Sequence, residues 1–128
     1  MHIVALTIFP EMFDSFWEYG IIKRAIDRGK IIPRVVNIRD FARDTHRTTD
    51  DRPFGGGCGM VMKPEPLAGA IREAERITGD ARKILLTPQG RSFNQQTARE
   101  FSREHGLSLV CGRYEGIDER IRHGFIDD

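Results

Sequence analysis

The chain has few features of a secreted, membrane-bound or metal-dependent protein. Only two of its 128 residues are cysteine, Cys58 and Cys111, and they lie too far apart to form a CxxC pair. That scarcity argues against a zinc cluster and is typical of reduced thiols in the cytoplasm. The apolar run at residues 1–9 is too short to span a membrane and lacks the basic leader of a signal peptide. We therefore expect a cytoplasmic protein with no membrane segment and no metal.

The chain also lacks a large net charge. It has 20 Lys and Arg against 19 Asp and Glu, a formal net charge of +1, so no global positive field indicates a nucleic-acid-binding protein. Any RNA site must therefore be local. With 39% hydrophobic residues, the chain is long enough to bury a core as a single domain.

The hydrophobic pattern predicts strands that alternate with helices. Strands are expected at residues 2–9, 31–38, 83–86 and 107–111, and helices at 10–20, 21–28, 66–79 and 92–106. Pro33 places the early part of the second strand at a sheet edge. Because strands separated by helices need crossover connections, the fold class is α/β with a parallel sheet.

Three local expectations follow from this pattern. Met12, Phe13, Phe16 and Trp17 share one face of the first helix and are expected in the core. Ser92 and Gln95 have the spacing of a capping box. Residues 39–59 contain almost no aliphatic side chains, so we expect them to contribute nothing to the core.

Four glycines lie within five residues of the segment DDRPFGGGCG at residues 50–59. Such glycines let backbone amides approach a ligand closely, but the segment matches neither a P-loop nor a GxGxxG motif. Four arginines and four aspartates alternate just before the first glycine. Two interpretations stay open, a flexible surface loop and a site for a phosphate backbone.

Two further segments follow strands directly. The first, TPQGR at residues 87–91, is either an ordinary turn or part of a ligand site, because ligands of α/β sheets bind where the strands end. The second is CGRYEGIDER at residues 111–120. Its Tyr114 offers a stacking face, and the carboxylate of Glu115 can accept hydrogen bonds from the ring N–H and the exocyclic amine of guanine. Residues 118–120 are interpreted as the start of a helix.

Several motifs together resemble one known family. They are FPEMF at 9–13, RDF at 39–41, HRTTDDRPFGGG at 46–57, GM at 59–60, TPQGR at 87–91 and CGRYEGIDER at 111–120. In this order they resemble the bacterial tRNA (guanine-N1)-methyltransferases, the TrmD family. The resemblance covers essentially the whole chain.

The resemblance implies a SPOUT-class α/β fold with a trefoil knot at the carboxyl side, a homodimer, and S-adenosylmethionine as cofactor. It implies methyl transfer to N1 of the guanosine immediately 3′ of a tRNA anticodon, with no role for DNA. Cofactor-binding residues are expected to be Thr87, Pro88, Gln89, Gly90 and Gly112, and catalytic residues Glu115 and Arg113. The target base and RNA are expected to contact Tyr114, Glu115, Gly57, Gly59, Arg52, Arg47 and His46.

Relatives in the family continue beyond the position of Asp128. They have a segment that completes the knot, an interdomain linker and a helical carboxyl domain, so residues 1–128 are expected to be an incomplete methyltransferase domain. An alternative is a non-catalytic α/β domain that binds RNA weakly. A third hypothesis, a cysteine hydrolase that uses Cys111 with His105 or His123, has no supporting residue order.

Overall fold

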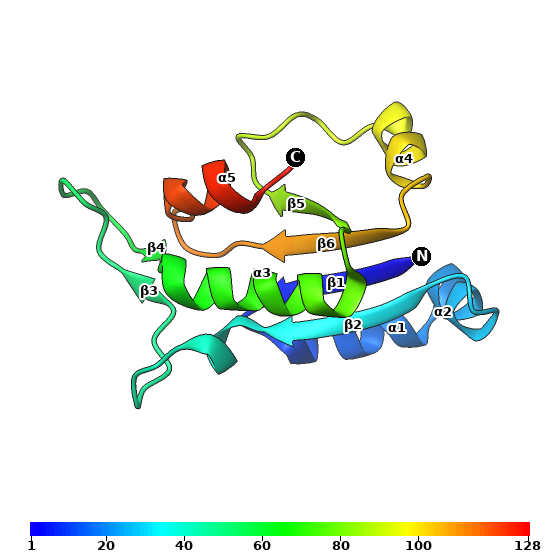
Figure 1. Cartoon of the computed structure of the whole chain (residues 1–128), viewed down its shortest axis with the longest axis horizontal. Helices are drawn as coiled ribbons and strands as arrows, with labels where there is room; N and C mark the ends of the chain where they lie inside the picture. The colour runs from blue at the N-terminus through cyan, green and yellow to red at the C-terminus, as the bar shows by residue number, and fades with distance from the viewer.

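The central strand β1 (His2–Thr7) is buried on both faces in the computed structural model, which describes residues 1–128. Val4 through Thr7 are all 3% exposed or less. β1 pairs in parallel with β2 (Ile32–Asn37) and with β6 (Gly106–Cys111), and β6 pairs in parallel with β5 (Arg82–Leu86). The sheet order is therefore β2-β1-β6-β5, with all strands in one direction (Figure 1). This confirms the predicted α/β class and places Pro33 in an edge strand.

Helices make the crossover connections between these strands. η1 (Pro10–Phe13), α1 (Asp14–Glu18) and α2 (Gly20–Asp27) lead from β1 to β2. η2 (Ile38–Phe41) and α3 (Pro64–Thr78) lead to β5, α4 (Gln95–Phe101) leads to β6, and α5 (Glu119–Phe125) follows β6. β3 (Asp50–Asp51) and β4 (Val61–Met62) form a small antiparallel hairpin that carries the glycine-rich segment. None of the helices combines the length and apolarity needed to cross a bilayer.

Most of the core lies between the sheet and α3. The predicted stripe of this helix is buried, with Leu67, Ala70, Ile71 and Ala74 at 0% exposure. These side chains pack in one cluster with residues of β1, β2, β5, β6 and α5. The helix starts at Pro64 instead of the predicted residue 66, because proline fits the first turn of a helix. The opposite face has only a small cluster, formed by Ile84, Phe101 and Leu107.

The prediction that the aromatic stripe of residues 10–20 lies in the core was wrong. Met12 is 61% exposed and Phe16 is 54% exposed, and neither core cluster includes a residue of this segment. The segment is broken into η1 and α1, and the rings of Phe13, Phe16 and Trp17 pack against one another.

Residues 39–59 contribute more to the core than their composition predicted. Phe41 packs against the main cluster, where it contacts Gly69 so closely that an added Cβ would lie 2.8 Å from Cβ of Phe41. Thr49 is completely buried. The expectation failed because one aromatic ring and one threonine are enough to anchor an otherwise polar segment.

Both edges of the sheet are covered in part. On the β2 side, Pro33 has no N–H to offer to a further strand. On the β5 side, the amide of Leu85 donates to the Asp128 carbonyl at 2.9 Å and the amide of Asp127 donates to the Lys83 carbonyl at 2.9 Å. Residues 127–128 therefore lie along the outer edge of β5.

The predicted capping box at Ser92 was also wrong, and the correction gives a test. The N-cap of α4 is Asn94, whose side-chain oxygen accepts hydrogen bonds from the amides of Gln96 at 2.9 Å and Thr97 at 3.0 Å. We expect Asn94→Ala to lower the free energy of unfolding by about 1 kcal/mol. Ser92→Ala is the control and should leave it unchanged in urea denaturation; equal losses in both variants would contradict this assignment.

Candidate functional site

The turns after β5 and β6 begin side by side at one edge of the sheet. The two strands are parallel neighbours, and their last residues, Leu86 and Cys111, are paired in register. Thr87 directly follows β5 and Gly112 directly follows β6, so both residues leave the sheet at the same edge. This is the carboxyl edge of the strands, where ligands of open α/β sheets bind. The two segments that were predicted to follow strands directly therefore lie at one edge.

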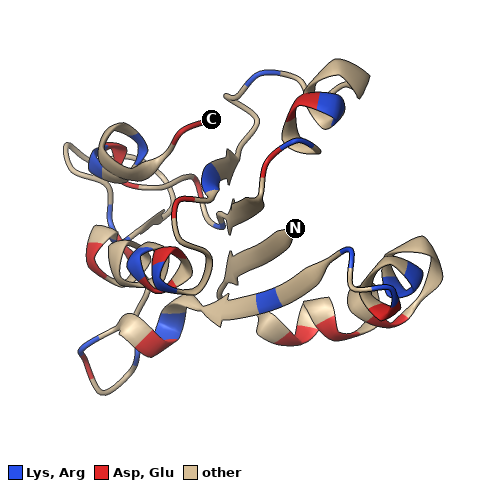
Figure 2. Ribbon diagram, turned by 45° about the vertical axis from the view of Figure 1, so that its right-hand side comes forward, with Lys and Arg blue, Asp and Glu red and all other residues tan.

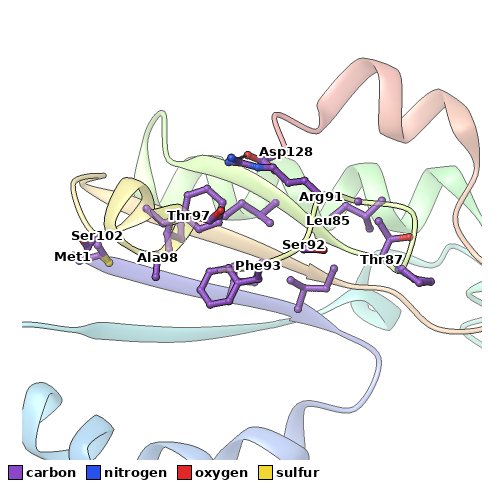
Figure 3. Close-up of a pocket in the computed structure, with 17 residues that line it drawn as sticks. Met1, Leu85, Thr87, Arg91, Ser92, Phe93, Thr97, Ala98, Ser102 and Asp128 are labelled. Atoms are coloured by element: carbon purple, nitrogen blue, oxygen red, sulfur yellow. Dashed lines mark hydrogen bonds and ion pairs between the residues drawn. The ribbon is translucent and has the colours of Figure 1, made fainter. Parts of the chain in front are cut away.

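A cavity of about 770 Å³ lies between the first turn, α4 and the uncovered face of β5 and β6 (Figure 3). Of the five residues expected to hold a cofactor, Thr87, Pro88 and Gly90 line this cavity. Gln89 and Gly112 do not. The other lining residues come mainly from β5, β6, the loop after the turn and α4, together with Met1, Ser102 and Asp128. Those of the strands, loop and helix are Ile84, Leu85, Leu86, Arg91, Ser92, Phe93, Thr97, Ala98, Phe101, Leu107 and Leu109.

The floor of the cavity is apolar and partly open. Alternate residues of β5 and β6, among them Ile84, Leu86 and Leu107, face α4 instead of α3. Leu86 is 52% exposed and Phe93 is 72% exposed, although both are large apolar side chains. The size and the mixture of an apolar floor with a polar turn are those of a small-molecule site.

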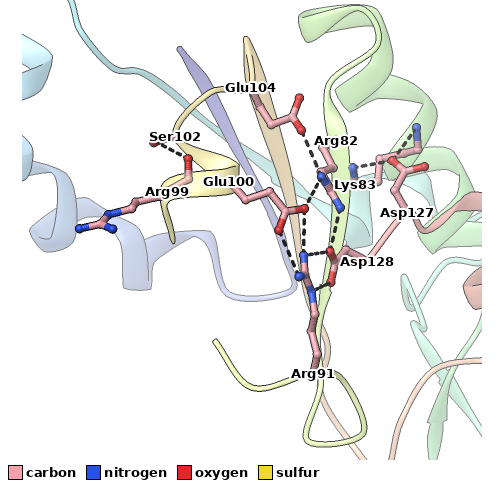
Figure 4. A network of polar contacts seen from close by, with 9 residues as sticks. All are labelled: Arg82, Lys83, Arg91, Arg99, Glu100, Ser102, Glu104, Asp127 and Asp128. Carbon is pink, nitrogen blue, oxygen red and sulfur yellow. Dashed lines mark hydrogen bonds and ion pairs between the residues drawn. The ribbon is translucent and has the colours of Figure 1, made fainter. Parts of the chain in front are cut away.

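Arg91, at the end of the first turn, anchors the loop to α4 and to the chain end (Figure 4). Its guanidinium donates to Asp128 Oδ1 at 2.9 Å and to Glu100 Oε2 at 3.2 Å. Arg82 joins the network by an ion pair with Asp128 at 3.0 Å. Hydrogen bonds from Arg91 hold the pKa of the Asp128 and Glu100 carboxyls below their ordinary values. Sequence reasoning missed this network, because no spacing pattern links its members.

The second turn is held against the β3–β4 hairpin. The amide of Glu115 donates to the Met60 carbonyl at 2.9 Å, and the amide of Met62 donates to the Gly116 carbonyl at 2.9 Å. Tyr114 has a φ of 63°, an uncommon backbone conformation for a residue with a side chain. Its hydroxyl lies 3.4 Å from Oγ1 of the buried Thr49.

Gly59 and Glu115 lie in direct contact. A Cβ added at Gly59 would collide with Cγ of Glu115 and would lie 3.2 Å from its Cδ. Glu115 is exposed and forms no ion pair, so its carboxylate is free to accept hydrogen bonds. The structure therefore brings together the glycine-rich hairpin and the turn that contains Tyr114 and Glu115. Gly57 is oriented elsewhere, with Pro53 as its nearest neighbour.

The arginines predicted to act at the site differ in the groups that they contact. The guanidinium of Arg113 lies 5.0 Å from the centre of the Phe9 ring, and its Nη2 lies 3.2 Å from the sulfur of Met12. Arg47 forms an ion pair with Asp40. Arg52 and His46 are exposed and form no ion pair. The catalytic and RNA-binding roles of these residues stay predictions.

The structure gives no support to a cysteine nucleophile. Cys111 is at the carboxyl end of β6, whereas His105 precedes the amino end of the same strand. His123 lies on α5, 3.4 Å from Glu119. Burial raises the pKa of the Cys111 thiol, the opposite of what a reactive thiolate needs.

The fold and the paired turns define an α/β domain with a candidate ligand site at the carboxyl edge of a parallel sheet. The family model described as "tRNA (Guanine-1)-methyltransferase TrmD" matches residues 1–128, and the chain belongs to this family. It is 53% identical over 128 residues to the tRNA (guanine-N(1)-)-methyltransferase of Desulfatibacillum aliphaticivorans, covering 100% of this chain and 49% of that protein.

Other relatives agree. The chain is 55% identical over 123 residues to the tRNA (guanine-N(1)-)-methyltransferase of Geotalea uraniireducens, with 96% of this chain and 50% of that protein covered. The solved structure of tRNA (m1G37) methyltransferase from Aquifex aeolicus matches with a TM-score of 0.91 at 36% identity, covering 100% of this chain and 57% of that chain. The chain thus spans about half the length of the curated relatives it matches.

The contact between Gly59 and Glu115 gives a matched pair of variants. Gly59 and Gly55 have nearly equal φ values of 88° and 87°, but no atom lies within 4 Å of a Cβ added at Gly55. Both alanine variants pay the same backbone strain, and only Gly59→Ala must displace Glu115. We expect hydrogen exchange at the Glu115 amide to accelerate in Gly59→Ala and to match the wild type in Gly55→Ala. Equal rates in the two variants would rule out a specific contact.

The Arg91 network predicts a pH-dependent contribution to stability. Because the pKa values of Asp128 and Glu100 are lowered in the fold, their contribution is fully present above the ordinary carboxyl pKa of about 4. It is lost as the pH falls through the lowered values. We expect Arg91→Ala to lower the free energy of unfolding at about pH 7, and the difference from wild type to shrink below about pH 4. Urea denaturation across this range checks this; a constant difference would show that the carboxylates are not involved.

Proposed function

We propose that this chain forms the methyl-donor and guanine site of a tRNA (guanine-N1)-methyltransferase. The enzyme transfers a methyl group from S-adenosylmethionine to N1 of the guanosine immediately 3′ of the anticodon. The observation that carries the proposal is the meeting of two turns at one sheet edge, one above an apolar cavity and the other carrying Glu115 against Gly59. Membership of the family supports the reaction class.

The residues of the cavity fit S-adenosylmethionine. A volume of about 770 Å³ is within the usual range for sites of this kind. Apolar side chains such as Leu86 and Leu107 would contact the adenine ring, and the backbone of Thr87–Gly90 would orient the polar part of the molecule. When bound, S-adenosylmethionine supplies a methyl group made electrophilic by a sulfonium sulfur. Gly112 leaves the sheet next to Thr87 but does not line the cavity, so it would contact only a part of the ligand that extends beyond the cavity toward the second turn.

Glu115 would hold the Watson–Crick edge of guanine. Its two carboxylate oxygens can accept from N1–H and from the exocyclic amine, which selects guanine over adenine. Guanine N1 keeps its proton at neutral pH, so the N1–H bond must break as the N1–carbon bond forms. We assign Glu115 to hold this edge and to accept the N1 proton. Tyr114, beside it, would stack on the base.

A positive group near O6 would stabilise the charge that develops as N1 loses its proton. Arg113 is the nearest arginine in sequence. To reach the base it would have to leave the Phe9 ring, a cation–π contact of about 0.5–1 kcal/mol at an exposed site. Arg52 and His46, exposed on and beside the hairpin, are proposed to contact the tRNA backbone, and Arg47 would do so only by releasing Asp40.

We also propose that the protein is a cytoplasmic homodimer. Its two cysteines are unpaired, as is usual in a reducing compartment. The exposed side chains of Phe16, Tyr19 and Ile21, which lie outside the cavity, present apolar surface that a second copy would cover.

The function is tested with Glu115→Gln. Loss of the proton acceptor should lower methyl transfer to a tRNA transcript by about a hundredfold or more, with methyl-donor binding unchanged in calorimetry. Glu119→Gln, at an exposed position of α5, is the matched control and should retain full activity. Unchanged turnover in Glu115→Gln would remove this residue from the reaction. Binding of tRNA without methyl transfer by the wild type would favour the non-catalytic alternative.

A further inference from the structure

A second hollow of about 470 Å³ lies on the other face of the molecule, between α3, α5 and the segment after η2. Its floor is apolar, formed by Ala68, Gly69 and Ile121. Three arginines surround it, Arg43, Arg72 and Arg120. The remaining lining residues are Phe41, Pro64, Glu65 and Phe125. We call this hollow the arginine groove.

Two of the three arginines have no acidic partner. Arg43 and Arg72 form no ion pair, whereas Arg120 is paired with Asp118. Arg72 is held in place by the Phe125 ring, with its guanidinium carbon 5.5 Å from the ring centre. Its planar fork is therefore oriented without being neutralised.

Two acidic residues, Asp118 beside the groove and Glu65 in its lining, reduce the positive charge of the arginine groove. Arg120 donates two hydrogen bonds to Asp118, at 2.9 and 2.8 Å, which offset most of its charge. Glu65 lines the groove and forms no ion pair, so it opposes one positive charge. The groove keeps a net positive charge after both acids are counted, because Arg43, Arg72 and Arg120 outnumber them.

The groove adjoins the proposed base site. α3 begins directly after Lys63, whose amide donates to the carbonyl of Thr49 at 2.9 Å, and Thr49 is the residue that contacts Tyr114. Arg120 follows Glu115 by five positions across the short turn that leads to α5. Figure 2 shows basic residues on α3, on α5 and around η2, at the end of the molecule where the strands terminate.

We propose that the arginine groove binds the phosphodiester backbone of the tRNA beside the nucleotide held at Glu115, an inference that rests on the function proposed above. Guanidinium groups match phosphate oxygens in a two-pronged geometry, and each phosphate that such a group neutralises releases condensed counterions from the RNA. An acidic protein would satisfy the same charges. Continuity with the site for Tyr114 and Glu115 favours RNA, because a bound nucleotide carries its flanking phosphates with it.

The test measures the salt dependence of RNA binding. A fluorescein-labelled anticodon stem–loop is titrated with this chain at several salt concentrations and followed by anisotropy. The double variant Arg43→Gln/Arg72→Gln should bind roughly tenfold more weakly at about 0.1 M salt. The slope of log K against log salt should fall by about 0.7–0.9 for each lost phosphate contact, roughly 1.5 in total.

The matched control is Arg99→Gln/Arg103→Gln, which removes the same charge from the α4 side. Both arginines are exposed and form no ion pair, and Arg99 points away from the network of Figure 4. This variant should retain the wild-type slope. All four side chains are exposed, and thermal unfolding of each variant confirms that it folds.

Three results would overturn the proposal. The first is an equal loss in the groove variant and the control, which would mean that only overall charge matters. The second is a wild-type chain that does not bind the stem–loop at any salt. The third is a groove variant that loses affinity for a polyaspartate peptide but not for RNA, which would indicate an acidic protein partner. Methyl transfer with Glu115→Gln is measured independently, so the catalytic proposal can hold while this one fails.

Discussion

The parallel pairing of β5 with β6 is the constraint on which the candidate site depends. Each strand enters from a crossover helix, so both run in the same direction and end at the same edge. The register places Leu86 opposite Cys111 at the end of both strands. The next residues, Thr87 and Gly112, therefore leave the sheet side by side. Two turns that are 25 positions apart in the sequence, at Thr87 and Gly112, become neighbours for this reason alone.

The two faces of the sheet differ in how completely they are packed. The α3 face holds nearly all the completely buried side chains and provides most of the stability. The α4 face is left with a small cluster and an open apolar floor. A fully packed second face would leave no room for a ligand, so the stability of one face permits the cavity on the other. Arg91 and its acidic partners then fix the loop that borders this cavity, with charge instead of packing.

Sequence reasoning predicted those features that depend on local periodicity. The buried run in β1, the apolar stripe of α3 and the edge position of Pro33 follow from side-chain spacing and proline chemistry, and the structure has all three. The two turns and a helix start at residues 118–120 were also predicted, and the structure adds that Asp118 is the N-cap of α5. In each case the pattern within a few residues is enough to determine the outcome.

The failures concern contacts between distant segments. The rings of residues 13–17 have the spacing of a core stripe, but spacing does not reveal that the helix breaks at Phe13 and stacks on itself. The anchoring of Phe41 on Gly69 depends on a helix that starts more than twenty residues later. The meeting of Gly59 with Glu115 was expected only through family resemblance, because no pattern in this sequence links the two positions.

The coverage of the outer edge of β5 affects how the protein behaves in concentrated solution. Exposed strand edges recruit strands from other molecules, which is a common first step in aggregation. Here the backbone of residues 127–128 occupies part of that edge, and Pro33 interrupts hydrogen bonding along the opposite one. Backbone hydrogen bonds along part of one edge of the four-stranded sheet and a missing donor on the other both oppose intermolecular strand exchange.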